Sequence, residues 1–140
     1  MKKQVKKLLN AVIEWAEGKP GILSIALVGS YARDEAKIDS DVDLVLLAST
    51  SKEFIDKPEW VKKFGNVKSL KIEDWGLVTS LRVFYQGELE VEFGMTTPEW
   101  ASKPIDEGTR QVIADGMKIL LDKPGLLDQA LKEVSGKGNN

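Results

Sequence analysis

The chain has 140 residues and a formal net charge of −2, and it contains no cysteine and no histidine. These absences exclude a Ser-His-Asp triad, an imidazole general base, a thiolate nucleophile, a disulfide framework, and zinc or iron–sulfur sites that use these residues. Catalysis would have to rely on carboxylates, Lys, Arg, Ser, Thr and Tyr, and any metal would be a hard cation with oxygen ligands, such as magnesium or manganese.

The first third of the chain predicts a helix followed by two buried strands. Apolar residues recur along one face over residues 5–16, which indicates an amphipathic helix. Residues 22–28 and 42–48 are almost continuously apolar, as in strands buried on both faces. Between them, residues 31–36 predict a short helix with Ser30 as its N-cap. Two strands with a helical crossover predict an α/β (α+β) domain, in which helices flank a mixed or parallel sheet.

The remaining two thirds predict shorter elements. Proline at a first helical position marks two helix starts, and a Gln-Gly pair marks a tight hairpin. In chain order we expect a helix over 58–64, strands over 67–72, 77–85 and 88–95, a helix start at 97–100, a helix over 106–115, a strand over 117–121 and a helix over 126–134. Residues 1–134 then form one domain, and residues 135–140 a disordered tail.

No membrane or secretion signal is evident in the sequence. No apolar run approaches the roughly 18 residues of a membrane span, and the N-terminal lysines are not followed by the apolar segment of a signal peptide. Proteins that bind nucleic acid usually carry a basic excess, which this chain lacks. We expect a cytoplasmic protein with no membrane partner and no nucleic-acid partner.

The segment that starts at Gly29 has the character of a phosphate-binding turn. Gly29 stands where a predicted strand ends and a helix begins, and its missing side chain lets a ligand approach the backbone. The free N–H groups of the following turn favour an anion, and Ser30 adds a hydroxyl donor.

Two aspartates follow a few residues later at the start of the second predicted strand. Asp41 and Asp43 are two positions apart, so both carboxylates point to the same face, roughly 7 Å apart along the chain. An isolated Asp-x-Asp is more often a pair of solvated acids. Here a buried strand and a Gly-Ser turn adjoin the pair, and this context favours a site for a divalent cation and a phosphate.

This stretch resembles the signature of the nucleotidyltransferase superfamily with the DNA polymerase β-like catalytic fold. Its minimal branch, which includes antibiotic nucleotidyltransferases, carries Gly-Ser-x-Ala-Arg, about six residues, and then Ser-Asp-x-Asp-Leu. The chain has all of the fixed residues at this spacing: Gly29, Ser30, Ala32, Arg33, Ser40, Asp41, Asp43 and Leu44. The resemblance implies a single nucleotidyltransferase domain with a polymerase β-like palm.

The resemblance also implies a reaction. Two Mg²⁺ ions (Mn²⁺ is an alternative) would bind the triphosphate of ATP or another NTP, an acceptor hydroxyl would attack the α-phosphorus, and pyrophosphate would leave. Carried over, Gly29 and Ser30 hold the β,γ-phosphates, Ser40 adds to the nucleotide site, and Asp41 and Asp43 bind metal. AMP transfer from ATP is the form we expect.

Two interpretations of Arg33 are open. It either orients the loop and touches phosphate, or it is a surface arginine paired with Asp34 or Asp39. Asp34 stands where relatives often carry glycine, and aspartate tolerates a left-handed backbone better than most residues.

The family uses a third carboxylate on a neighbouring strand, as metal ligand and often as general base. Glu88, Glu90 and Glu92 alternate with apolar residues and are expected to share one face of a strand. Glu92 is the preferred third carboxylate and Glu90 the alternative. The plain alternative is that all three form the polar face of an antiparallel strand.

The sequence leaves the identity of the acceptor open. It is either a small molecule or a partner protein's hydroxyl, as in minimal antitoxins that transfer AMP to a toxin. A partner protein or a homodimer could supply the acceptor surface, and a degenerate module that only binds nucleotide is the competing function. The tryptophans are expected to pack in the core or at its rim, with Trp75, in a predicted loop, as the exception.

Overall fold

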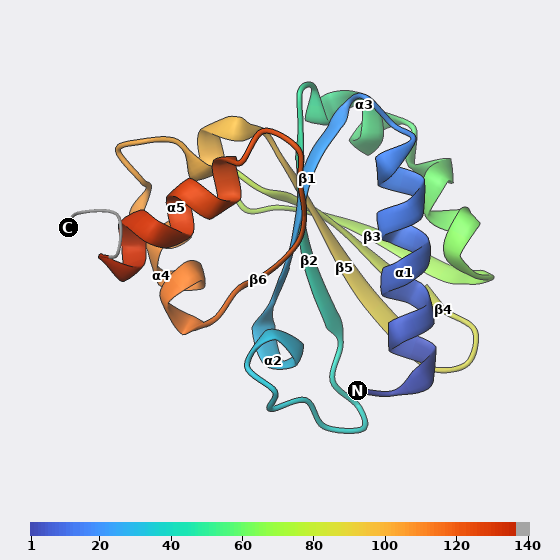
Figure 1. The fold of residues 1–140 in the computed structure, drawn as a ribbon. Coiled ribbons are helices and arrows are strands. Elements are labelled where there is room, and N and C mark those ends of the chain that lie inside the picture. Colours follow the sequence, from blue (N-terminus) through green and yellow to red (C-terminus); the bar gives the residue numbers. More distant parts are fainter. Residues whose placement is uncertain (137–140) are drawn as a thin grey trace.

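A six-stranded mixed sheet forms the middle layer of the protein, which a computed structural model describes over residues 1–136 (Figure 1). Its strands are β1 (Ile22–Val28), β2 (Val42–Ala48), β3 (Val67–Asp74), β4 (Thr79–Tyr85), β5 (Leu89–Thr96) and β6 (Lys118–Asp122). They lie in the order β3-β4-β5-β2-β1-β6. β2 and β5 are parallel, and the other neighbouring pairs are antiparallel. The predicted α/β class with a mixed sheet and flanking helices is confirmed.

Helices cover both faces of this sheet. They are α1 (Lys3–Glu17), α2 (Gly29–Ala32), α3 (Ser51–Asp56), α4 (Glu107–Asp115) and α5 (Leu126–Ser135), with 3₁₀ helices η1 (Pro58–Phe64) and η2 (Pro98–Ala101). α1, α3 and η1 pack on one face and α4, α5 and η2 on the other, while α2 lies at one end of β1 and β2 (Figure 1). Within residues 1–136, none of the helices combines the length and the hydropathy needed to cross a bilayer.

Aromatic rings fill the space between α1, η1 and the sheet. Trp15 stacks on Trp60 with ring centroids 4.8 Å apart, and Phe64 and Phe93 pack edge-on or tilted around the pair. Offset and edge-to-face contacts of this kind add to the stabilisation from burial. The expectation that the tryptophans pack in the core therefore holds for this pair and for the buried Trp100, whereas Trp75 is 65% exposed.

The short helix after β1 differs from the prediction. We expected residues 31–36 with Ser30 as N-cap, but α2 begins at Gly29, follows Val28 directly and ends at Ala32. Gly29 has φ +72°, which lets the chain turn directly from strand into helix. Asp34 has φ +58°, so the left-handed backbone that aspartate tolerates stops the helix after a single turn.

The hairpin between β4 and β5 is longer than predicted. Tyr85 pairs with Leu89, so residues 86–88 form the loop and Glu88 is not part of the strand. Gly87 and Glu88 both have positive φ, of 87° and 59°, and this pair of left-handed residues turns the chain. Glu88 therefore does not share a strand face with Glu90 and Glu92, which corrects that expectation.

The other elements follow the prediction with small shifts. The strands over 22–28 and 42–48 have their predicted bounds, but they pair antiparallel, so the short connection is no parallel crossover. α3 was not predicted, and α5 extends to Ser135, the first residue of the predicted tail. Residues 137–140 of that tail lie outside the described residues.

Tyr85 offers a test of the packing under η1. Its hydroxyl donates a hydrogen bond to the buried carbonyl oxygen of Val61 at 2.7 Å. Tyr85→Phe removes the donor and leaves that carbonyl unpaired, which should lower the free energy of unfolding by about 1–2 kcal/mol. Tyr31→Phe is the matched control, because the buried Tyr31 ring makes no such hydroxyl bond within residues 1–136, and it should change stability by less than about 0.5 kcal/mol. Urea unfolding measures both, and equal effects would contradict the assignment.

Candidate active site

Two strands that are distant in sequence place the acidic residues side by side. β2 and β5 are parallel, and their register sets Asp43 directly beside Glu92. Paired residues of neighbouring strands point to the same face, and Asp41 comes just before β2 begins. The carboxyl groups of Asp41 and Glu92 both lie within hydrogen-bonding reach of the Asp43 carboxyl. Three of the predicted acids therefore converge on one point of the sheet.

Gly29 lies directly against this point. Val28 is in register with Asp43, so the next residue reaches the aspartate's side chain. A Cβ at position 29 would come 2.2 Å from the Asp43 Oδ2 atom, far inside van der Waals contact. With its φ of +72°, this position needs glycine for its backbone and for the space that it leaves. The Gly-Ser turn and the Asp-x-Asp pair are thus one packed unit.

The acids are held close enough to repel one another. Burial, then the neighbouring Asp41 and Glu92, raise the pKa of Asp43 to about 8. A carboxyl with two like-charged neighbours keeps its proton until a cation neutralises the group. A pKa raised in this way is typical of functional sites, and here the like charges favour the binding of a cation.

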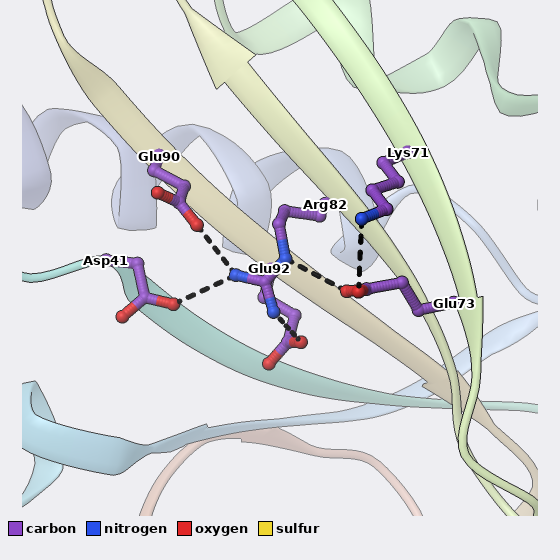
Figure 2. A network of polar contacts seen from close by, with 6 residues as sticks. All are labelled: Asp41, Lys71, Glu73, Arg82, Glu90 and Glu92. Carbon is purple, nitrogen blue, oxygen red and sulfur yellow. Dashed lines mark hydrogen bonds and ion pairs between the residues drawn. The ribbon is translucent and has the colours of Figure 1, made fainter.

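Arg82 on β4 is the residue that sequence reasoning missed. Its Nη2 lies 2.8 Å from Glu92 Oε1, its Nη1 lies 2.6 Å from Glu90 Oε2 and 3.4 Å from Asp41 Oδ2, and its Nε lies 2.9 Å from Glu73 Oε1. Figure 2 shows the guanidinium between carboxylates from β3, from β5 and from the segment before β2. Arg82 is 23% exposed, so these contacts are only partly screened by water.

A signal for Arg82 was present in the sequence. It is the only charged residue of β4, between Leu81 and Val83, and β4 pairs with β5 through the loop over 86–88. That register sets Arg82 opposite Glu92. A charged residue in an apolar strand, opposite a candidate catalytic acid, could have been found once the hairpin's loop length was known.

The acids of β5 have different surroundings. Glu92 contacts Arg82 and lies beside Asp43, whereas Glu90 contacts Arg82 and lies two residues farther along β5 from Asp43. Both are half-buried, so neither is simply a solvated acid on a polar face.

The remaining predicted site residues are less directly engaged. Ser30 lies on α2, next to Gly29. The Oγ of Ser40 accepts a hydrogen bond from the Lys37 N–H at 2.8 Å and so stabilises its own turn. Arg33 pairs with Glu35 at 3.7 Å, and this corrects the alternative that named Asp34 or Asp39 as its partner.

The donor set fits a hard divalent cation. Asp41, Asp43 and Glu92 supply only carboxylate oxygens, and a bound cation would offset the burial and the like charges that raise the pKa of Asp43. Within residues 1–136 no three such side chains are already spaced as the ligands of one ion. Arg82 instead engages the oxygens of Asp41 and Glu92.

Gly29→Ala tests the close packing of the turn on Asp43. The new methyl group must displace the carboxylate and hold a left-handed backbone, which should lower the unfolding free energy by about 1–2 kcal/mol. Displacement of Asp43 should also lower, at least about tenfold, the nucleotidyl transfer that the sequence resemblance predicts. Gly125→Ala is the matched control, because Gly125 also has a positive φ (76°) but nothing lies within 4 Å of its added Cβ. Equal activity losses in the two variants would contradict the contact with Asp43.

Comparison with known proteins identifies a family and a shared fold. The sequence matches the family model described as streptomycin adenylyltransferase over residues 1–137, while no curated protein matches it. An aminoglycoside 6-adenyltransferase from Bacillus subtilis superposes with a TM-score of 0.59 at 10% identity, over 84% of this chain and 40% of that one. A Thermotoga maritima CCA-adding enzyme complexed with tRNA superposes with a TM-score of 0.53 at 15% identity, over 93% of this chain and 32% of that one.

These two likenesses show the fold, and the chain spans less than half the length of either structure. The family match covers nearly the whole sequence. The chain therefore belongs to the streptomycin adenylyltransferase family, which agrees with its resemblance to the polymerase β-like nucleotidyltransferases.

Proposed function

We propose that the protein transfers AMP from ATP to a hydroxyl group of an acceptor, with release of pyrophosphate. The observation that carries the proposal is the convergence of Asp41, Asp43 and Glu92 beside the Gly29 turn. The acceptor oxygen forms a bond to the α-phosphorus, the bond from that phosphorus to the β-phosphate oxygen breaks, and the hydroxyl proton passes to a carboxylate. Such a transfer depends on positioning and on charge stabilisation, which side chains other than His and Cys can supply.

Each residue of the cluster has a proposed role. The backbone at Gly29 and the hydroxyl of Ser30 bind the β,γ-phosphates; because α2 is a single turn, individual N–H groups matter more here than a helix dipole. Asp41, Asp43 and Glu92 would hold Mg²⁺, with Mn²⁺ as a substitute, and a bound ion would neutralise charge on the triphosphate. Glu92 accepts the hydroxyl proton, and its contact with Asp43 supports it over Glu90 for this role.

For the acceptor we propose a small cationic molecule with hydroxyl groups. A cavity of about 400 Å³ adjoins the acid cluster, and its lining includes Asp39, Glu88, Glu90, Lys68 and the ring of Phe84. Three carboxylates against one lysine favour a cation, and an exposed aromatic ring suits the apolar face of a sugar. The family description, streptomycin adenylyltransferase, names such a molecule.

The test is an acceptor screen with α-labelled ATP and Mg²⁺. We expect pyrophosphate release and a labelled product of higher mass with streptomycin or another hydroxylated, multiply cationic acceptor, but not with a neutral sugar of similar size. The Asp41→Asn, Asp43→Asn double variant gives the background, and equal turnover in both proteins would contradict the site. Labelled AMP on a protein hydroxyl would show that the acceptor is a partner protein and would contradict the proposed small molecule. Tight ATP–Mg²⁺ binding without pyrophosphate release across the screen would instead indicate a module that only binds nucleotide.

A further inference from the structure

Strand β3 forms one edge of the sheet and is exposed along most of its length. Leu70 and Ile72 are 36% and 51% exposed, although they pair with the fully buried Val83 and Leu81 of β4. Since paired residues share a face, these two apolar side chains extend the core face of the sheet to its uncovered edge. Long, exposed apolar edges promote pairing with another strand.

The backbone of this edge presents its hydrogen-bonding groups at the same two residues. The N–H of Trp75 donates to the Val78 carbonyl on the β4 side. In an antiparallel ladder this orientation alternates, so Ser69, Lys71 and Glu73 also face β4. The N–H and C=O groups of Leu70 and Ile72 therefore face away from the sheet.

We propose that β3 binds β3 of a second copy of the chain in antiparallel register about a two-fold axis at Lys71. In this register Leu70 of each copy lies opposite Ile72 of the other. The backbone groups that face outward then form reciprocal hydrogen bonds, and four apolar side chains close a single patch on the core face. Isologous contacts of this kind are the commonest route to a homodimer.

The charges along β3 suit this register. The two Lys71 side chains face each other, but each has its own Glu73 at 3.9 Å and the second copy's Glu73 on the diagonal.

Other registers are less favourable. A shift by two residues sets Leu70 against Asp74 in one direction and Ile72 against Lys68 in the other. An odd shift would pair residues that point to opposite faces. The proposed register also brings the exposed Trp75, at the tip of the β3–β4 hairpin, opposite Val67 of the second copy. The result is one continuous sheet with both candidate active sites on the same face.

Sedimentation of the whole chain gives the first test. We expect a mass of twice 15.5 kDa at micromolar concentration. Ile72→Lys should raise the dimer dissociation constant at least about 100-fold. Ile38→Lys, at an isoleucine that is 85% exposed in a loop, is the matched control and should leave it unchanged. A wild-type monomer throughout, or a dimer that tolerates Ile72→Lys with its secondary structure intact, would overturn the proposal.

Cysteine cross-linking tests the register, because the native chain has no cysteine. In the proposed dimer, residue 71 of one copy lies opposite residue 71 of the other, in a pair without backbone hydrogen bonds. The two Cα atoms are then about 4.5–5.5 Å apart, within reach of a disulfide. Lys71→Cys should therefore cross-link on mild oxidation. Ser69→Cys should not, because its two copies lie about 13 Å apart along the strands. Equal cross-linking of both variants, or of neither, would overturn the register.

Discussion

Asp43→Asn is expected to lower nucleotidyl transfer at least about 1000-fold, or about 4 kcal/mol in transition-state stabilisation. Asparagine keeps the shape of the side chain but removes the negative charge that binds the cation. Asp43 is the central member of the cluster, within reach of both Asp41 and Glu92, so neither neighbour can take its place. The rate of labelled AMP transfer at saturating ATP and acceptor measures the loss.

The same variant should be more stable than the wild type in EDTA. Burial and two carboxylate neighbours raise the pKa of Asp43 to about 8 in the folded protein, from an ordinary value of 3.8. Between these pH values the folded state keeps a proton that the unfolded state releases, so wild-type stability falls as the pH rises through this window. Asparagine does not titrate, and at pH 8 the gain should be on the order of 1 kcal/mol, because the group is partly solvated.

Urea unfolding at pH 5 and pH 8 measures the gain in stability of Asp43→Asn separately from its loss of AMP transfer. The stability difference between variant and wild type should grow with pH in EDTA. Asp56→Asn is the matched control, since Asp56 is an exposed acid at the end of α3, outside the acid cluster and its adjoining cavity. It should leave transfer unchanged within about twofold. A variant that loses activity together with stability would show that Asp43 is needed for folding, against the repulsion inferred from its surroundings.

Arg82→Ala is expected to lower the free energy of unfolding by about 2–3 kcal/mol, one of the largest effects of any single side chain outside the apolar core. The change leaves Asp41, Glu73, Glu90 and Glu92 without their shared cation. The loss is smaller than for a fully buried ion pair, because Arg82 is 23% exposed. Mg²⁺ should restore part of the lost stability in the variant, since the carboxylates that are released can bind it.

The control for this variant is Arg110→Ala on α4. Arg110 makes no ion pair within residues 1–136, so its removal should change stability by less than about 0.5 kcal/mol. Thermal unfolding with and without Mg²⁺ measures both variants. A destabilisation of Arg82→Ala that Mg²⁺ does not reduce would mean that the arginine acts through packing of its stem alone.

Much of the fold followed from local patterns. β1 and β2 were predicted with their observed bounds because both are nearly continuous apolar runs, interrupted only by Ser24 and Asp43, and such strands leave little ambiguity. α3 was missed, since its short segment over 51–56 carries no apolar stripe and is held by Phe54 against the aromatic cluster. Contacts of this kind form only after the chain has folded.

The acids of the candidate site were predicted from the sequence, but the arginine that pairs with them was not. Gly29, Asp41 and Asp43 were identified from their spacing, and the structure packs them together. Arg82 depends on the pairing of β4 with β5, which a loop one residue longer than expected sets in register. A sequence pattern identifies the carboxylates that are near one another in the chain. The Arg82 guanidinium that faces them comes from a neighbouring strand.

The parallel pairing of β2 with β5 divides the site between a local and a distant part of the chain. Arg82, Glu90 and Glu92 belong to the β3-β4-β5 meander, whose contacts are short in sequence and close at a low entropic cost. Asp43 joins them across about fifty residues, through a contact of the kind that limits folding rates. Recovery of activity during refolding therefore reports the closure of this long-range pairing, whereas the contacts of Arg82 with Glu73, Glu90 and Glu92 report the meander alone.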